Sequence, residues 1–257
     1  MTGVYFSGTG NTKHCVELLC ALLDPEMPVI PLEESGSRNK IAEAQEILLG
    51  YPVQFSNIPY FVRDYIRRNA DLWAGKTVFC VATMGAFSGD GAGCAARLLQ
   101  KYGAHVCGGL HLQMPDSVCD VKALKKSADQ NRSLIQQADE KIRRTAAELK
   151  NGRYPQEGLS LFSHIAGLLG QRLWFYTRTS GYSDKLKIGS ACTGCGRCAA
   201  LCPMQNLIVR DGKAAGGDRC TMCYRCISSC PEQAITLLGR QVYEQCRFDR
   251  YKGGLKA

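Results

Sequence analysis

The chain has 257 residues, of which 45% are hydrophobic and 21% charged, so its composition excludes a disordered chain and allows one or two globular domains. It holds neither an apolar run of about eighteen residues nor a basic leader ahead of an apolar segment. We therefore expect a cytoplasmic protein without a transmembrane helix or a secretory signal. The net charge of +9 is uneven: residues 1–150 carry 17 Lys and Arg against 16 Asp and Glu, and residues 151–257 carry 15 against 7.

Residues 1–150 alternate short apolar runs with helical patterns, which is typical of a parallel α/β sheet with helices on both faces. Five strands are predicted, at residues 4–6, 28–30, 47–49, 77–82 and 104–112. Helices are predicted over residues 11–23, from Pro59 onward, from a Gly-rich loop at 85–93 to Tyr102, and over about 121–150. The sequence thus predicts a doubly wound five-stranded parallel sheet.

A loop rich in Gly and hydroxyl side chains joins the first predicted strand to the first helix. It reads Ser-Gly-Thr-Gly-Asn-Thr over residues 7–12. A loop at a helix N-terminus offers backbone N–H groups to an anion. This one lacks the Gly-x-Gly-x-x-Gly pattern of dinucleotide sites and the Lys-Ser/Thr ending of triphosphate loops. Its residues alone fit either a monophosphate site or an ordinary capped turn.

Residues 151–185 form a connector with a strongly apolar character. We expect it to pack between two domains, and the alternative is an amphipathic helix on a membrane surface. Its apolar side chains are Leu159, Leu161, Phe162, Ile165, Leu168, Leu169, Leu173, Trp174 and Phe175.

The spacing C-x2-C-x2-C-x3-C-P occurs twice, 28 residues apart, and indicates a duplicated unit. In this pattern three cysteines bind one 4Fe–4S cluster and the fourth reaches the other cluster. The predicted ligands are Cys192, Cys195, Cys198 and Cys230 for one cluster, and Cys220, Cys223, Cys226 and Cys202 for the other. Paired zinc sites are the alternative, but zinc modules separate two C-x2-C pairs by a longer loop.

Residues 186–237 resemble a bacterial two-cluster ferredoxin, and Tyr5 to Thr12 resemble the FMN phosphate loop of flavodoxins. The whole chain resembles the flavodoxin–ferredoxin fusion family of anaerobic bacteria. This resemblance implies a flavodoxin-like domain at 1–150, the connector at 151–185, a small α+β ferredoxin domain with two 4Fe–4S clusters at 186–238, and a tail at 239–257.

The resemblance also implies an FMN site built from three loops. The matching residues are Ser7, Thr9, Gly10, Asn11, Thr12, Pro52, Val53, Phe55, Thr83, Met84, Gly85 and Phe87. Candidates to stack on the flavin ring are Tyr51, Phe55 and Phe87. Asp90 is the only acidic residue in the two loops that follow the third and fourth predicted strands.

We therefore expect an electron-transfer protein of the oxidoreductase class that passes single electrons between two 4Fe–4S clusters and FMN. The alternative is an FMN-dependent terminal reductase of a small organic substrate. A third class, a binding module with a basic face for nucleic acid, is disfavoured because basic residues partly neutralise the clusters. Ferredoxins of this type are usually acidic, so the basic residues here favour an acidic redox partner. The sequence identifies no catalytic residue.

Overall fold

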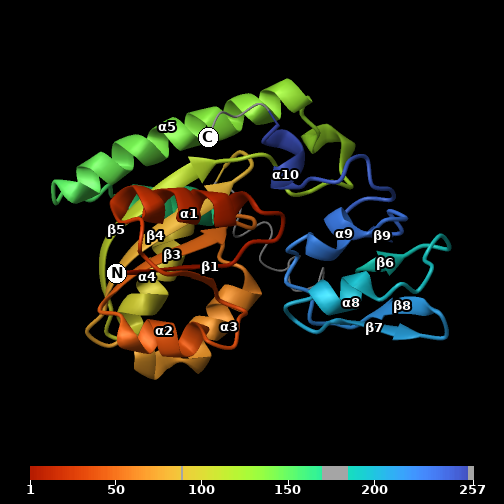
Figure 1. Ribbon diagram of the computed structural model, residues 1–257, viewed down its shortest axis with the longest axis horizontal. Helices are drawn as coiled ribbons and strands as arrows, with labels where there is room; N and C mark the ends of the chain where they lie inside the picture. Colours follow the sequence, from red (N-terminus) through yellow and green to blue (C-terminus); the bar gives the residue numbers. More distant parts are fainter. Residues whose placement is uncertain (88, 170–184, 254–257) are drawn as a thin grey trace.

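The computed structural model describes residues 1–87, 89–169 and 185–253 (Figure 1). Its first domain holds a parallel sheet of order β2-β1-β3-β4-β5. This order is that of flavodoxin-like folds, with the switch point beside β1. The predicted fold class is confirmed. The strands are β1 Thr2–Tyr5, β2 Val29–Pro31, β3 Glu46–Pro52, β4 Thr77–Met84 and β5 His105–Gln113.

Helices cover both faces of the sheet, as Figure 1 shows. They are α1 Asn11–Leu23, α2 Ser37–Glu43, α3 Tyr60–Arg68, α4 Gly91–Lys101 and α5 Ala128–Lys150, with 3-10 turns η1 Ala70–Leu72 and η2 Lys122–Leu124. One core joins the sheet to α2, α3 and α4, and the other joins it to α1 and α5. Strand β4 contributes Val78 and Cys80 to the first core and Phe79 and Val81 to the second, as its unbroken apolar run predicts.

The helix predicted to begin near Val121 begins seven residues later, at Ala128. Ser127 Oγ accepts a hydrogen bond from the Gln130 N–H at 3.2 Å, and Gln130 Oε1 accepts one from the Ser127 N–H at 2.8 Å. This capping box fixes the start of α5. Leu124, expected on the buried stripe of the helix, lies in η2 and is 41% exposed.

The second domain is a small α+β unit, as predicted, in which two short antiparallel sheets flank two short helices. Its elements are β6 Lys187–Ile188, α8 Arg197–Leu201, β7 Leu207–Arg210, β8 Lys213–Gly216, α9 Arg225–Ser229 and β9 Ile235–Thr236. The repeat predicted from the cysteine spacing is visible in the backbone, because Gln205 and Gln233 occupy equivalent positions with φ of 50° and 49°. A tail with the helical turn α10 Phe248–Tyr251 follows.

The connector begins by covering β5. The Gly109 N–H donates to the Pro155 carbonyl at 2.8 Å, and the Glu157 N–H donates to the Gly109 carbonyl at 3.0 Å. Helix α6 Leu161–Gly167 follows and contacts α4.

The large apolar side chains of α6 and the residues just after it are not buried between the domains. Leu161, Phe162 and Leu169 are 74%, 81% and 66% exposed, and Ile165 is 46% exposed. The expectation of packing between domains is therefore wrong for these four residues, because α6 contacts α4 through its other side. Leu173, Trp174 and Phe175 lie outside the described residues. Among the helices described, none is long and apolar enough to cross a lipid bilayer.

A buried carboxylate joins the two domains. Asp120, in the segment after β5, is 1% exposed and accepts hydrogen bonds from Tyr224 Oη at 2.9 Å and from the N–H groups of Leu237, Leu238 and Gly239 at 2.7, 3.0 and 3.1 Å. Buried donors without an acceptor are costly, so this one side chain satisfies four groups of the second domain.

We predict that Asp120→Ala weakens the attachment of the second domain. Each buried donor left without an acceptor costs about 1–3 kcal/mol, so several kcal/mol of stability are at stake. The melting temperature of the anaerobically purified protein checks this. Asp218→Ala, which removes an exposed acidic side chain of the second domain, is the matched control. Equal melting temperatures for both variants would contradict the role of Asp120.

Candidate functional site

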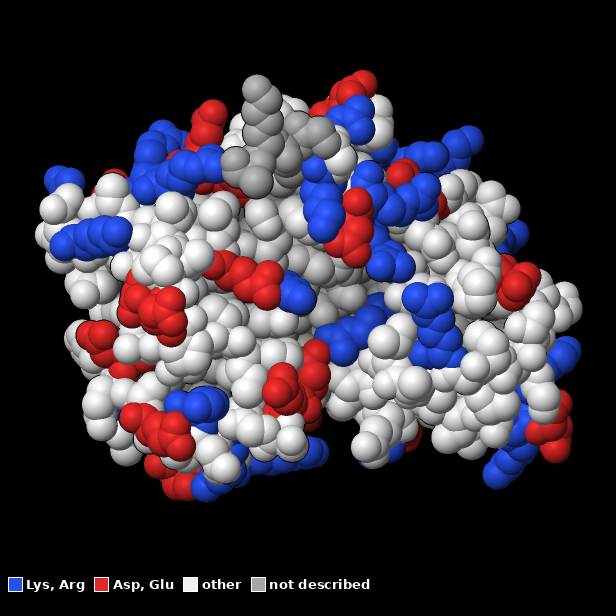
Figure 2. Space-filling view, viewed as in Figure 1, with Lys and Arg blue, Asp and Glu red and all other residues white. Residues whose placement is uncertain are grey.

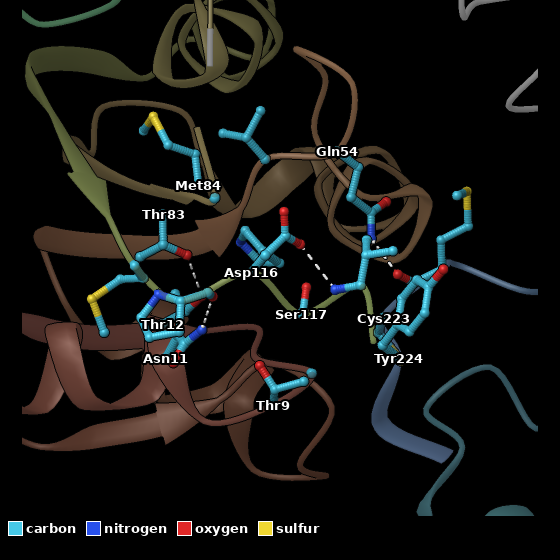
Figure 3. Close-up of a pocket in the computed structure, with 18 of the residues that line it drawn as sticks. Thr9, Asn11, Thr12, Gln54, Thr83, Met84, Asp116, Ser117, Cys223 and Tyr224 are labelled. Carbon is cyan, nitrogen blue, oxygen red and sulfur yellow. Dashed lines mark hydrogen bonds between the residues drawn. The ribbon is translucent and has the colours of Figure 1, made fainter. Parts of the chain in front are cut away.

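A cavity of about 250 Å³ lies where the carboxyl ends of the strands meet the second domain. The loops that follow β1, β3, β4 and β5 form most of its wall, and residues 222–224 of the second domain close it (Figure 3). Ligand sites of parallel α/β sheets lie at this edge, beside the switch point of the strand order.

The structure brings eleven of the twelve residues predicted for FMN binding into this one cavity. They are Ser7, Thr9, Asn11, Thr12, Pro52, Val53, Phe55, Thr83, Met84, Gly85 and Phe87. The exception is Gly10, which precedes α1 with a φ of 100°. A Cβ atom there would lie 3.0 Å from Phe248 Cβ, so Gly10 faces the C-terminal tail.

The loop at residues 7–12 suits an anion. No side chain caps the N-terminus of α1, and no acidic residue lies in its first turn. The N–H groups of that turn and the positive end of the helix dipole therefore face the cavity wall. Two side chains of the loop hold its shape: Asn11 Nδ2 donates to the Pro115 carbonyl at 2.7 Å, and the Thr12 and Thr83 hydroxyls lie 2.7 Å apart. Asn11 Oδ1 is buried without a partner among the described residues, which leaves an acceptor for a ligand hydroxyl.

Of the three aromatic candidates for stacking, the structure places two at the cavity. Phe55 and Phe87 line it. Tyr51 is fully buried in the core, where its hydroxyl donates to the Gly91 carbonyl at 2.8 Å, so Tyr51 is excluded as a stacking residue.

The acid at the cavity is Asp116 rather than Asp90. Asp90 is fully buried and pairs with Arg97 at 2.5 Å and His164 at 2.8 Å, away from the cavity. Asp116 follows β5, lines the cavity and accepts a hydrogen bond from the Val118 N–H at 2.9 Å (Figure 3). Burial raises the pKa of its carboxyl above the usual value. The sequence signal was available, since Asp116 lies at the carboxyl end of a predicted strand.

The eight motif cysteines line two separate small cavities in the second domain. One is lined by Cys202, Cys220, Cys223 and Cys226, and the other by Cys192, Cys195, Cys198 and Cys230. These are the two crossed sets predicted from the spacing, in which the fourth cysteine of each run joins the other run.

Backbone N–H groups point at one or more sulfurs in each set, at 3.3–3.4 Å. The pairs are Ala214 with Cys192, Met222 with Cys220, Asn206 with Cys202 and Ala234 with Cys230. Such donors favour the thiolate form and tune the potential of an iron–sulfur cluster. The Ala214 N–H lowers the pKa of Cys192, whereas burial raises the pKa of Cys223 to about 12. Among the described residues, no three Cys, His, Asp or Glu side chains lie close enough together to hold a single metal ion, so each set is defined by the cavity that its four cysteines line.

The first set and the large cavity share a wall. Cys223 lines both, together with Met222 and Tyr224. A Cβ atom on Gly8 would lie 1.8 Å from the Cys223 carbonyl oxygen, so the two loops pack with no space for a side chain. None of the four cysteines of the second set lines the large cavity.

Arg225 holds these two loops together. Its guanidinium donates to the Ser7 carbonyl at 2.6 Å and pairs with Glu33. Gln54, in the loop after β3, connects that loop to the same cysteine loop, because its amide donates to the Thr221 and Met222 carbonyls at 2.8 and 3.0 Å (Figure 3). The phosphate-type loop and one cysteine loop therefore form a single unit.

Comparisons with known proteins find similarity in both parts of the chain. Residues 185–231 match the family model of the 4Fe–4S dicluster domain. The chain is similar to a flavodoxin from the domain Archaea (15% identity over 58% of this chain and 97% of that one, TM-score 0.42). It is also similar to the Megasphaera elsdenii flavodoxin (25% identity, 48% and 95%, TM-score 0.41) and to the Trp repressor binding protein of Bacillus subtilis (13%, 56% and 96%, TM-score 0.43). A search of curated proteins finds no match.

The strand order and the matched family model define the class of this protein. It is a flavodoxin-like domain fused to a 4Fe–4S dicluster domain of ferredoxin type.

We predict that Gly8→Ala disrupts the junction of the two loops. The added methyl group would overlap the Cys223 carbonyl, and relief requires a backbone shift that costs about 1–3 kcal/mol. The variant should melt at a lower temperature and retain less iron per chain. Gly36→Ala is the control, because its Cβ atom would lie at an ordinary 3.7 Å from Ile30 Cδ1. Unchanged iron content in both variants would show that the junction tolerates a side chain.

Proposed function

We propose that this protein is an iron–sulfur flavoprotein that passes single electrons between two 4Fe–4S clusters and FMN. One observation carries the proposal: Cys223 belongs to the wall of the small cavity lined by one predicted set of cluster ligands and also to the wall of the large cavity proposed for the flavin. Cofactors bound in the two cavities would be separated from each other by one cysteine loop.

Each part of the chain has a defined task in this proposal. The loop at 7–12 binds the phosphate through backbone N–H groups, and Phe55 and Phe87 flank the ring. FMN, when bound, can accept two electrons and release them one at a time. The fixed contact between the domains holds the donor and the acceptor at one separation, so transfer does not wait for a diffusional encounter.

The shared wall also orders the two clusters. We assign the cluster of Cys202, Cys220, Cys223 and Cys226 as proximal to the flavin, and the cluster of Cys192, Cys195, Cys198 and Cys230 as distal. Cys195 is an exposed residue of the distal set. An external redox partner would therefore meet the distal cluster first.

The charge of the second domain favours an acidic redox partner. Arg197, Arg210 and Lys213 are exposed beside the distal set, with Asp211 between the last two. Figure 2 shows Lys and Arg outnumbering Asp and Glu on the visible side of this domain. Opposite charge on a partner would speed the encounter and orient it.

A terminal reductase is the second candidate, and Asp116 favours it. A buried carboxyl with a raised pKa keeps its proton at a higher pH than an exposed one, so Asp116 can deliver a proton inside the cavity. Phe87 is 48% exposed, which leaves that part of the wall open to solvent. A small organic acceptor could enter there and receive electrons from the flavin.

We predict about eight irons, eight sulfides and one FMN per chain after anaerobic purification. Reduced two-cluster ferredoxin, too large to enter the cavity, should reduce the clusters before the flavin in rapid mixing. In Cys223→Ser, which loses a ligand of the proximal cluster, the flavin should remain oxidised while the distal cluster is reduced. Cys107→Ser, outside both sets, is the control. Equally fast flavin reduction in Cys223→Ser would overturn the relay.

A separate measurement distinguishes the two candidates. If the protein is a reductase, Asp116→Asn should slow turnover of a quinone probe by about 10²-fold or more, because a positioned acid contributes that much, and it should leave cluster-to-flavin transfer unchanged. The wild-type rate should also fall as the pH rises through the raised pKa of Asp116, because the carboxyl then loses its proton. A rate that is the same in both proteins would leave the relay as the function.

A further inference from the structure

The C-terminal tail returns from the second domain to the first and contacts the loop at 7–12. The Tyr243 N–H donates to the Cys119 carbonyl at 2.9 Å, and the Phe248 N–H donates to the Thr9 carbonyl at 2.9 Å. Tyr251, 2% exposed, packs into the core that α1 and α5 share. Its helical turn, α10, contacts α5 (Figure 1). The tail therefore acts as a strap over the loop at 7–12.

Two cysteines outside the cluster sets meet under this strap. Cys119 lies in the segment after β5 and is 3% exposed, whereas Cys246 lies in the tail and is half-buried. Both line the same small cavity, and both belong to the apolar cluster at the core of the second domain. Ser228 Oγ donates to Cys119 Sγ at 3.8 Å, which holds that sulfur in place.

We propose that Cys119 and Cys246 form a redox-active dithiol that closes to a disulfide by exchange with a low-molecular-weight disulfide. Cys246 is the more accessible sulfur and attacks first: a mixed disulfide forms and one thiol leaves. Cys119 then attacks Cys246 Sγ, the protein disulfide forms and the second thiol leaves. The protein loses two protons and two electrons, and the small disulfide takes them up to become two thiols.

The surroundings of the pair suit this order of attack. Its contact with Cys119 lowers the pKa of Cys246, which increases the thiolate fraction of the attacking sulfur. Cys119 is buried and serves as the resolving thiol. A partly accessible thiol beside a resolving thiol is the arrangement of redox-sensitive cysteines.

Closure would tie the strap to the flavin-type site. Cys246 is two residues from Phe248, whose ring lies against Gly10 and stacks on His14 with centroids 4.2 Å apart. Cys119 is one residue beyond the cavity-lining segment that ends at Val118. A disulfide would hold both segments together, and this consequence rests on the proposed binding of FMN to the loop at 7–12.

The test is anaerobic equilibration of the intact cluster-loaded protein with reduced and oxidised glutathione at a series of ratios. Free thiols are then alkylated, and the digest is examined by mass spectrometry. We expect a peptide that links Cys119 to Cys246 and a loss of two alkylatable thiols per chain. Cys246→Ser should abolish the link, and Cys107→Ser, which removes a half-buried thiol of β5, should leave it unchanged.

Two outcomes would overturn the proposal: no linked peptide at the most oxidising ratio, or a link from Cys246 to a cysteine other than Cys119. The flavin consequence is measured separately, as the rate of FMN release from the oxidised and reduced forms. Release from the oxidised form should be about tenfold slower or more, since a covalent link across a long loop opposes opening of the strap. A linked peptide in a chain that binds no FMN would sink the proposed function and leave the dithiol standing.

Discussion

The contact between Gly8 and the Cys223 carbonyl is the constraint on which the arrangement of this protein depends. The absence of a side chain at Gly8 lets a cysteine loop of one domain lie directly on the phosphate-type loop of the other. Arg225 joins the same two loops, and Gln54 joins the loop after β3 to the same cysteine loop. Asp120 satisfies four donors farther along the boundary. Buried polar contacts of this kind specify one geometry, because an unpaired partner on either side would be costly.

The local elements of the first domain could be predicted closely because each depends on short-range pattern. The range of α1 agrees with the prediction, and the apolar run of β4 shows its burial on both faces. The start of α5 was missed because apolar periodicity continued past the true boundary, whereas the Ser127 and Gln130 capping box marked it. Cap chemistry was the better signal than periodicity there.

Parts of the site that follow from a local sequence motif could be predicted, whereas contacts between segments far apart in the chain could not. Both cysteine sets could be paired from spacing, since the motif carries its own crossed connection. The burial of Tyr51 and the pairing of Asp90 depend on side-chain direction, which a loop sequence does not fix. The shared wall at Cys223 and the cavity shared by Cys119 and Cys246 join segments far apart in the chain, and no local pattern indicates them.

The segment at residues 155–157 has a consequence for association between copies of the chain. Strand β5 is an edge of the sheet, and an uncovered edge of nine residues would offer its backbone to a strand of another molecule. Pairing of Gly109 with Gln156 occupies the middle of that edge, and Pro28 and Pro31 remove N–H donors at β2, the opposite edge. Each border of the sheet thus carries a feature that hinders strand addition by another molecule.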